Sequence, residues 1–402
     1  MLSKKMTRFF RILLIAAFVV PCLSAAAFAA TYYVDSVSGN DSNSGNTSSS
    51  PWKTIAKVNK SSFQPGDSIL FAAGRSWQEQ LNPPSNGAAG KPITFGAYGT
   101  GDKPTIDGNN SIQYNINWNK SYITIDGLHL TRAANCNISQ WSGEADYGIV
   151  QNCLLEYSIG MGIYAGQSAS LTAKNWIVRN NVFQNGVNGS PAKHDIYIKW
   201  ASGWLIENNR FTDKKASAVN LNGSSDCIVR YNYSSGHVAQ FVQFYQDTAG
   251  GSKNNQIYYN VVNGDNQLIY AGGGSGHSGN VVYNNTQYGG KIGIYIEGGG
   301  TFAAVKNNIF WGLSGTVLNN TSSMGSVSNN NLNSYNPLFV NAGTDFHLTA
   351  SSPCRNAGTK VSLTRDMDGK DISSLTSPDI GAYQYSATAT ATLSPPTNLR
   401  LL

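Results

Sequence analysis

The sequence is poor in charge, since only 12% of its 402 residues are Asp, Glu, Lys or Arg. Lys and Arg number 28 and Asp and Glu 22, but four of the basic residues lie within the first eleven positions. Without these four, 24 basic residues stand against 22 acidic ones, which excludes the strong positive charge of a protein that binds nucleic acid or an anionic membrane. The surface must instead be covered by Asn, Ser, Thr, Gly and Tyr, as in proteins that meet sugars or in an inert extracellular coil.

Cysteine is scarce as well, with five in the whole chain. Cys136, Cys153, Cys227 and Cys354 follow the N-terminal segment, and no two of them have a spacing typical of a disulfide. We therefore expect buried thiols. The sequence also has no CxxC motif and no His-rich spacing, which excludes the usual zinc and redox motifs.

Long hydrophobic runs are absent after the N-terminus. Residues 12–20 are apolar, follow Lys4, Lys5, Arg8 and Arg11, and precede the small-residue sequence AFA at 27–29. This order predicts a signal peptide over residues 1–29, cleaved after Ala29. No later segment approaches the ~20 apolar residues that a membrane span needs. We expect a protein without a membrane span that is secreted, extracellular or periplasmic.

What the chain does have is a repeated asparagine. Aligning the short apolar segments places one column at spacings of 28, 28, 23, 28, 25, 23 and 22 residues, occupied by Cys153, Asn181, Asn209, Asn232, Asn260, Asn285, Asn308 and Asn330. Such periods are typical of coils in which each turn covers its neighbour. Asn and Gly are poor in helix interiors, whereas the Val, Ile and Tyr of these segments favour strands. We predict an all-β coil in which the stacked amides hydrogen-bond from turn to turn.

A second strand follows each of these segments by about fifteen residues, as in residues 195–199, 218–222, 241–245 and 293–297. Alternation along a strand predicts that Ile196 and Ile198 point inward while Asp195, Tyr197 and Lys199 point outward. These outward columns are the predicted location of a site.

Three stretches resemble the secreted right-handed parallel β-helix proteins, the pectate-lyase-like superfamily, over nearly the whole mature chain. They are the opening TYYVD at 31–35 with GND at 39–41 and SPWKTI at 50–55, the repeated IxxNNxF segments, and the closing NPLFV at 336–340 with PDIGA at 378–382. The resemblance implies a right-handed parallel β-helix solenoid. It implies less about activity, because lyases, glycosidases, epimerases and proteins without known activity share these ends.

The expected layout has five parts. Residues 1–29 form the signal peptide, 30–95 an N-terminal cap with a short helix, 96–335 the coil, 336–385 a C-terminal cap, and 386–402 a flexible tail rich in Thr, Ala and Pro. Ser50 is the expected N-cap of the short helix, and Pro51 its first residue. Trp52, Ile55 and Val58 would lie on its buried face.

The cluster at residues 193–199 is the candidate catalytic site. A lyase removes the proton beside a uronate carboxylate, and in similar family members Lys or Arg is often the base while Asp residues hold calcium. We therefore assign Lys199 or His194 as the base and Asp195 as a ligand of a possible calcium ion. Gly162 and Gly166 would leave space above this cluster. A solvated strand surface explains the same residues without any chemistry.

Polar and aromatic residues of the same columns are the candidate substrate-binding set: Tyr164, Tyr197, Asn222, Gln243 and Tyr245. Aromatic faces with interleaved amides suit a sugar. Stacking of the rings on a sheet would also stabilise the coil without any ligand.

Two classes of function follow. The first is a lyase acting by β-elimination on an acidic polysaccharide; the second is a non-catalytic module that binds glycan or serves at the cell surface. A glycoside hydrolase ranks lower, because the outward acids Asp195 and Glu297 lie four turns apart and cannot act as a pair. A pair of acids from the turns, such as Asp247 with Asp265, stays open. In each case the expected partner is a polysaccharide, and the protein is expected to be a monomer.

Overall fold

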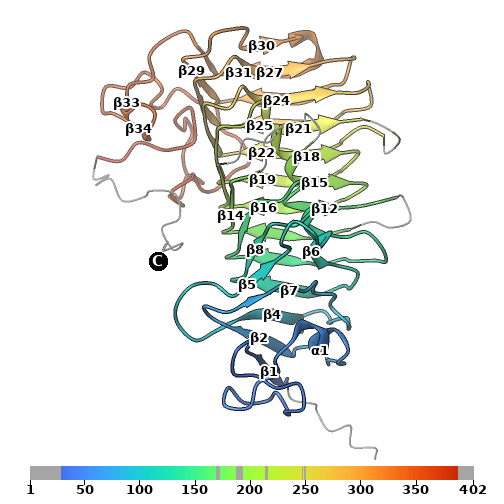
Figure 1. Ribbon diagram of the computed structural model, residues 1–402. Coiled ribbons are helices and arrows are strands. Elements are labelled where there is room, and N and C mark those ends of the chain that lie inside the picture. The colour runs from blue at the N-terminus through green and yellow to red at the C-terminus, as the bar shows by residue number, and fades with distance from the viewer. Residues whose placement is uncertain are drawn as a thin grey trace, which may run out of the picture.

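The computed structural model describes residues 29–168, 173–186, 193–212, 216–246, 248 and 250–387. Within these residues the chain winds as a coil of three parallel sheets with 12, 11 and 9 strands, here called sheets A, B and C (Figure 1). Over residues 93–319 each turn contributes one strand to A, then B, then C, and each strand pairs with its counterpart in the next turn. This confirms the predicted all-β parallel β-helix. Nearly all of the predicted signal peptide and tail lies outside the described residues.

The strands are short, and successive turns repeat them. Sheet A comprises β1 (Thr31–Val34), β2 (Ser68–Ala72), β4 (Ile93–Tyr98), β7 (Ile123–Asp126), β10 (Ile149–Gln151), β13 (Ile177–Arg179), β16 (Leu205–Glu207), β19 (Ile228–Arg230), β22 (Gln256–Tyr258), β25 (Asn280–Tyr283), β28 (Phe302–Lys306) and β31 (Met324–Ser328). Sheet B comprises β3 (Ser76–Trp77), β5 (Thr105–Asp107), β8 (His129–Thr131), β11 (Leu154–Glu156), β14 (Val182–Gln184), β17 (Arg210–Thr212), β20 (Tyr233–Ser235), β23 (Val261–Asn263), β26 (Thr286–Tyr288), β29 (Ile309–Trp311) and β32 (Asn331–Leu332). Sheet C comprises β6 (Tyr114–Asn117), β9 (Cys136–Ser139), β12 (Ile163–Ala165), β15 (His194–Lys199), β18 (Ser217–Asn222), β21 (Gln240–Tyr245), β24 (Gln267–Gly272), β27 (Ile292–Ile296) and β30 (Leu318–Asn319).

The repeated asparagines form a ladder at the bend between sheets A and B. The side-chain Nδ2 of Asn181 donates to Oδ1 of Asn209 at 3.0 Å, and that of Asn209 donates to Asn232 at 3.1 Å. The same bond continues through Asn260, Asn285, Asn308 and Asn330. Each ladder amide from Asn181 onward also donates to a backbone carbonyl, for example Asn209 to Val178 O. The predicted amide ladder is confirmed.

The residue before each ladder position, not the ladder residue itself, has the left-handed backbone. Asn180 and Asn208 have φ of 56° and 54°, and Tyr231 and Tyr259 occupy the same position with φ of 56° and 51°. Asn tolerates this conformation better than most residues. The two asparagines of each NN pair therefore have different roles. The first adopts the left-handed backbone of the bend, and the side chain of the second hydrogen-bonds to the next turn.

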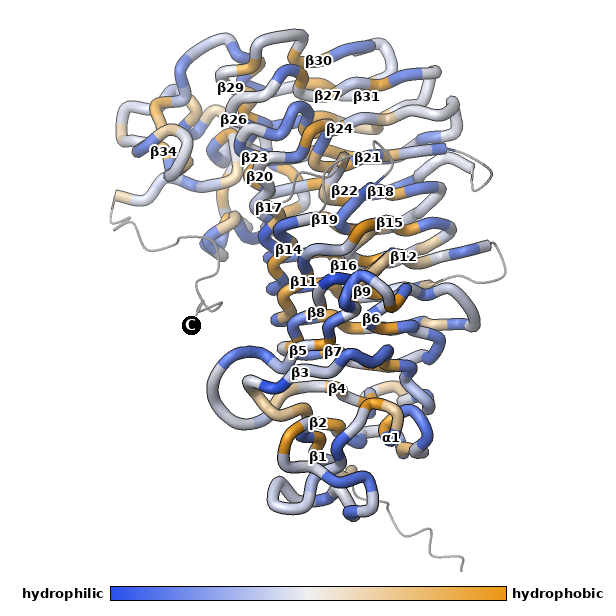
Figure 2. The backbone as a smooth tube through the Cα atoms, viewed as in Figure 1, coloured by the Kyte–Doolittle hydropathy of each residue, from blue (hydrophilic) through white to orange (hydrophobic). Residues whose placement is uncertain are grey.

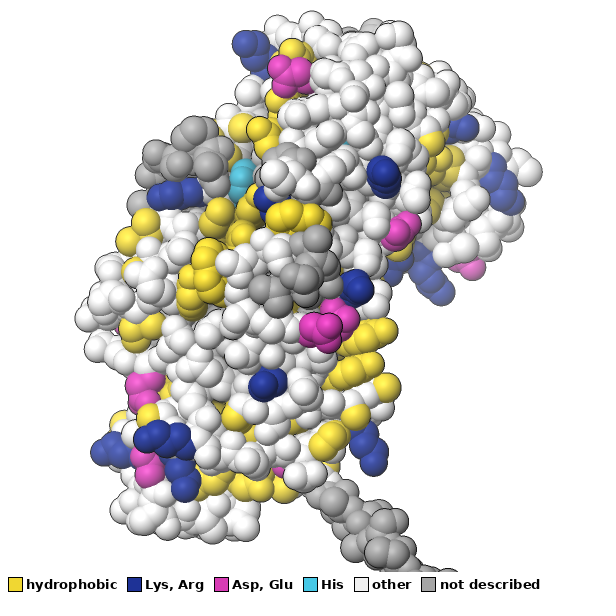
Figure 3. Space-filling model, turned by 90° about the vertical axis from the view of Figure 1, so that its right-hand side faces the viewer, with side chains coloured by type: hydrophobic (Ala, Val, Ile, Leu, Met, Phe, Trp, Pro, Cys, Tyr) yellow, Lys and Arg dark blue, Asp and Glu magenta, His cyan; other side chains and the backbone are white. Residues whose placement is uncertain are grey.

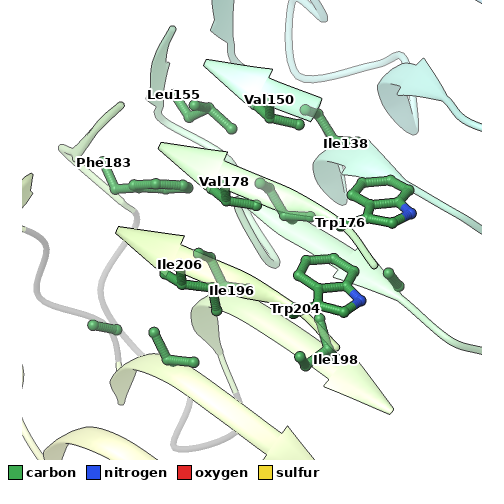
Figure 4. Close-up of a cluster of buried hydrophobic side chains, with 14 of the residues drawn as sticks. Ile138, Val150, Leu155, Trp176, Val178, Phe183, Ile196, Ile198, Trp204 and Ile206 are labelled. Carbon is green, nitrogen blue, oxygen red and sulfur yellow. The ribbon is translucent and has the colours of Figure 1, made fainter. Parts of the chain in front are cut away.

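A single apolar core fills the coil from Val34 to Met324. Trp176 and Trp204 stack at 4.9 Å between ring centroids (Figure 4), and Phe183 stacks on Phe211 at the same distance. Ile196 and Ile198 enter this core from sheet C, as predicted. Hydrophobic and hydrophilic segments alternate along each turn (Figure 2), which is the pattern of a wall with one buried and one exposed face.

The N-terminal helix begins later than predicted. Helix α1 spans Ile55–Asn59, and its N-cap is Thr54, whose hydroxyl accepts from the Lys57 N–H at 3.0 Å. The prediction of Ser50 and Pro51 is wrong because Trp52 is extended: its N–H donates to Tyr33 O, and it forms a parallel bridge with Val34 of β1. Ile55 and Val58 are buried in the core, as expected.

The C-terminal segment folds back along the flank of the coil. It includes the antiparallel pair β33 (Phe339–Asn341) and β34 (Asp345–Leu348), which lies beside β29 in Figure 1, whereas η1 (Thr321–Ser323) precedes β31 in the last turn of the coil. Phe346 and Ile380 pack on the outer side of sheet B, and Ile372 packs on Tyr258 of sheet A. This segment therefore covers sheets A and B in the last turns.

Cys136, Cys153, Cys227 and Cys354 are buried, and no disulfide joins them within the described residues, as expected. Burial raises the pKa of the Cys153 thiol to about 12, so this thiol stays protonated. In the part of the chain that the structure describes, no helix combines the length and hydropathy needed to cross a membrane.

Candidate functional site

The outer face of sheet C carries a column of aromatic and amide side chains. Strand pairing brings Tyr164 beside Tyr197, and then Asn220, Gln243, Tyr270 and Tyr295 follow in register on successive strands. Trp141, just after β9, packs on Tyr164 and is 46% exposed. We call these residues the outer lane: Trp141, Tyr164, Tyr197, Asn220, Gln243, Tyr270 and Tyr295.

Two groups of rings form the ends of the outer lane. At one end the ring centroids of Trp141 and Tyr164 lie 5.9 Å apart, and those of Tyr164 and Tyr197 lie 5.4 Å apart. At the other end Tyr270 and Tyr295 stack at 5.9 Å with nearly parallel planes. Asn220 and Gln243 lie between them. The lane thus has apolar ring faces on both sides of a polar centre, an arrangement that suits the apolar and hydroxyl-bearing faces of sugars.

A hydrogen-bond chain fixes the polar centre. Asn220 Nδ2 donates to Gln243 Oε1 and to His194 Nε2, both at 3.0 Å. Because His194 Nε2 accepts, its ring proton is on Nδ1, which lies 2.6 Å from the Ser217 hydroxyl. Beside this chain, Asn222 Nδ2 donates to the Tyr197 hydroxyl at 2.9 Å.

Lys199 lies at the border of the outer lane. It pairs in register with Asn222, which in turn pairs with Tyr245, so these three form a neighbouring outward column. Its ammonium nitrogen is 4.2 Å from the centroid of the Trp200 ring. Lys199 is the only Lys or Arg in the nine strands of sheet C that the structure describes. Figure 3 shows that charged side chains are few on the face turned to the viewer and lie there in small groups.

The prediction that Asp195 points outward is wrong. Its side chain is 0% exposed, and Ile196, the next residue, is buried as well. The alternation fails because the strand bends there: His194 pairs with Ser217 and Ile196 with Val219, while Asp195 is skipped. The same position is skipped in the following strands, where Ala218, Phe241 and Leu268 are all buried. Asp195 therefore points to the interior, and His194 and Lys199 point to the outside.

Asp195 belongs to a buried ionic cluster. His237 Nε2 lies 3.0 Å from Asp195 Oδ2, and His237 Nδ1 lies 3.2 Å from Asp265 Oδ2. The Asp265 carboxylate also accepts from the His237 N–H and from the Ser234 hydroxyl. Although burial opposes the charged imidazole, the two carboxylates outweigh it and raise the pKa of His237 to about 10. The histidine is a buried cation that ties together turns 42 residues apart.

The residues present do not fit calcium at Asp195. Calcium requires six to eight oxygen ligands. Among the described residues, no group of three or more His, Cys, Asp or Glu side chains could hold a metal ion. Asp195 is fully buried against His237. Asp213 and Asp247 lie outside the described residues.

The structure brings most of the predicted site residues together. Tyr164, Tyr197 and Gln243 lie in the outer lane, and Lys199, Asn222 and Tyr245 form the next column. His194 is on the same face but 5% exposed, with both ring nitrogens in the hydrogen-bond chain. Gly162 and Gly166 do not open space above the cluster: a Cβ on Gly166 would lie 1.6 Å from Lys199 O, so these glycines allow close strand packing.

Sequence reasoning missed Asn220, Tyr270 and Trp141. Tyr270 lies between Ile269 and Ala271, which are both buried, so it is the outward residue of this part of β24. Pairing β24 with β21 and β27 places Tyr270 in the lane, between Gln243 and Tyr295. Trp141 follows its strand and has no periodic signal.

Comparison with known proteins places the fold. Pectate lyase Pel9A superposes with a TM-score of 0.69, covering 89% of this chain and 96% of that protein at 18% sequence identity. This chain has the parallel β-helix fold of a pectate lyase. XylC, solved with xylose, superposes with a TM-score of 0.55 at 11% identity and covers 89% of this chain and 98% of that one.

At the level of sequence the likeness is local. A lacto-N-biosidase of Bifidobacterium longum subsp. longum is 42% identical over 85 residues, which are 20% of this chain and 5% of that enzyme. The chain therefore spans only a small part of this curated relative. No family model matches the chain. These likenesses establish the fold and leave the activity to be argued from the site.

Proposed function

We propose that this protein is exported and acts on polysaccharide held along the outer lane, and that it cleaves an acidic unit by β-elimination with Lys199 as the base. The outer lane carries this proposal, because it combines exposed and half-buried rings with amides over seven residues on one face. The C-terminal segment packs on sheets A and B, so it leaves this face to other partners. The fold neighbour Pel9A is a pectate lyase, which supports the class of reaction.

Lys199 is the better base on this face. His194 Nε2 accepts from Asn220, and its Nδ1 proton faces Ser217, so the imidazole is committed to the hydrogen-bond chain. Lys199 stands beside Tyr197 and Asn222, where a sugar on the lane would pass. A neutral amine there removes the proton from the carbon beside the uronate carboxylate. The glycosidic C–O bond breaks, a C=C bond forms, and the leaving oxygen takes a proton from water.

The assay is the ultraviolet absorbance of the unsaturated product. The purified protein is incubated with pectate, with alginate and with neutral glycans, each with and without calcium. We expect a rise with an acidic glycan and at least a hundredfold loss in Lys199→Ala. The matched control is Lys253→Ala, which removes an exposed lysine from a turn before sheet A. An unchanged rate in Lys199→Ala would refute the assignment of the base.

A non-catalytic glycan-binding module is the second candidate, favoured by the single cation in the strands of sheet C. This role predicts that glycans bind and Tyr197→Ala weakens binding, with no new reducing ends and no absorbance. A hydrolase, the class of the locally similar lacto-N-biosidase, would release reducing ends without the absorbance. It requires a pair of carboxylates about 5–10 Å apart. In the described strands of sheet C the one acid is Asp195, which points inward.

A further inference from the structure

At the centre of the outer lane, the hydrogen bonds of Asn220 determine which side-chain atoms are left to accept and which to donate. Both N–H groups of the Asn220 side chain are used, one by His194 Nε2 and one by Gln243 Oε1. The group that Asn220 has left is its carbonyl oxygen Oδ1. Gln243, whose oxygen accepts from Asn220, has its Nε2 hydrogens left to donate. An acceptor and a donor therefore stand on adjacent strands.

The oxygen of Asn220 lacks a donor although the residue is nearly buried. Asn220 is 4% exposed, and no donor among the described residues lies within hydrogen-bond distance of its Oδ1. A buried carbonyl without a donor is unfavourable, and native proteins rarely keep one unless a water or a ligand satisfies it. The ladder asparagines, equally buried, bond with both amide atoms. Asn115 and Asn137 of sheet C also have an Oδ1 without a donor, so what distinguishes Asn220 is its position in the outer lane beside Gln243.

The same centre carries no charge. Asn220 and Gln243 are neutral, and so are their neighbours in register, Tyr197 and Tyr270. Lys199 is one strand and two residues away from Asn220, in the adjacent column. A polymer with a carboxylate on every sugar would place several anions along the lane opposite a single described cation. A desolvated carboxylate without a cation is unfavourable.

We propose that Asn220 and Gln243 form a subsite for a neutral, hydroxyl-bearing sugar, so that the glycan has uncharged units at this subsite and a carboxylate only near Lys199. One sugar hydroxyl donates to Asn220 Oδ1, and a neighbouring hydroxyl accepts from Gln243 Nε2. The rings of Tyr197 and Tyr270 flank the bound sugar on either side. This inference rests on the proposed function, since it names the class of glycan that the outer lane takes.

The test is isothermal calorimetry with three probes: polygalacturonate oligomers, neutral β-linked oligosaccharides, and oligomers in which uronates alternate with neutral sugars. We expect the alternating oligomers to bind at least tenfold more tightly than the polygalacturonate oligomers, with little dependence on salt. Asn220→Leu should weaken binding of the neutral and alternating probes about tenfold. Gln256→Leu, which removes an exposed amide from sheet A, is the matched control and should bind as the wild type does.

Asn220→Asp separates binding from folding, because it keeps the shape of the side chain and adds a negative charge. The Asn220→Asp variant should lose less affinity for the neutral oligosaccharides than for the polygalacturonate oligomers. The ratio of these two affinities should therefore be larger than in the wild type. The subsite would be overturned if polygalacturonate oligomers bound more tightly than the alternating oligomers, in a salt-sensitive way, and if Asn220→Leu left that binding unchanged. If Tyr197→Ala still abolished that binding, the proposed function would stand without it. Failure of all three probes to bind would overturn both.

Discussion

Two sets of stacked amides in this protein are almost equally buried and differ in how completely they are bonded. In the ladder between sheets A and B, Asn209 donates to Val178 O and to Asn232 and accepts twice from Asn181. In the outer lane, Asn220 donates twice and its oxygen lacks a donor among the described residues. The ladder amides satisfy one another and stabilise the fold, whereas Asn220 Oδ1 in the outer lane is left to accept a hydrogen bond from another molecule.

The largest expected effect comes from the buried cluster beneath the lane. His237→Leu leaves the carboxylates of Asp195 and Asp265 buried without the cation between them, and should lower the free energy of unfolding by about 3–5 kcal/mol at neutral pH. Denaturant unfolding measures this loss. The control is His347→Leu, which removes a more exposed histidine held by Asp345 and Asp368. A smaller loss at His237 than at His347 would contradict the assignment of the buried cation.

Breaking the ladder should have the next largest effect. Asn209→Leu removes the acceptor of two bonds from Asn181 and two donors, so we expect a loss of about 2–4 kcal/mol in stability. Glycan affinity should be unchanged in the folded fraction. Thermal unfolding and calorimetry on one sample make both measurements. A selective loss of affinity without a fall in melting temperature would remove the distinction between ladder and lane.

The pH dependence of stability sharpens the assignment. His237 has a pKa of about 10 in the folded protein, above its ordinary value of 6.5. Its contribution to stability is therefore complete below pH 6.5 and is lost as the pH rises through 10. His347, with a pKa of about 9, acts in the same direction. Unfolding at stepped pH should show that His237→Gln reduces the decline toward alkaline pH and that the double variant with His347→Gln reduces it further.

The smallest effect is expected at the exposed end of the lane. Trp141→Ala should weaken binding of long oligosaccharides about three- to tenfold through the lost ring face, and leave short ones that occupy only Asn220 and Gln243 unaffected. Stability should change little, since the ring is 46% exposed. Affinity measured against oligosaccharide length tests this, with Tyr335→Ala as a control on the C-terminal segment. An equal loss at every length would place Trp141 outside the lane.

The sequence contained enough to predict the coil, because the ladder repeats and each repeat carries the same apolar pattern. It could not show that the strand bends at Asp195, since the residues on either side keep an ordinary alternation. That bend sends Asp195 inward to His237, 42 residues away in the chain. Helix α1 was placed too early because Trp52 bonds to β1, a contact between segments that local helix signals do not contain. The pairing of Asn220 with His194 likewise depends on register across two turns.

The C-terminal segment, finally, constrains the number of turns in the coil. Its backbone carbonyls accept from side chains at one repeated position on separate turns: Arg365 O from Tyr231, Asp379 O from Asn284, Thr359 O from Asn307 and Ala357 O from Asn329. A turn inserted between these positions would separate the donors from their carbonyl acceptors. A turn inserted before Tyr231 would leave all four hydrogen bonds in place. Turns can therefore be added or lost in the part of the coil before Tyr231, whereas the C-terminal segment fixes the number of turns after it.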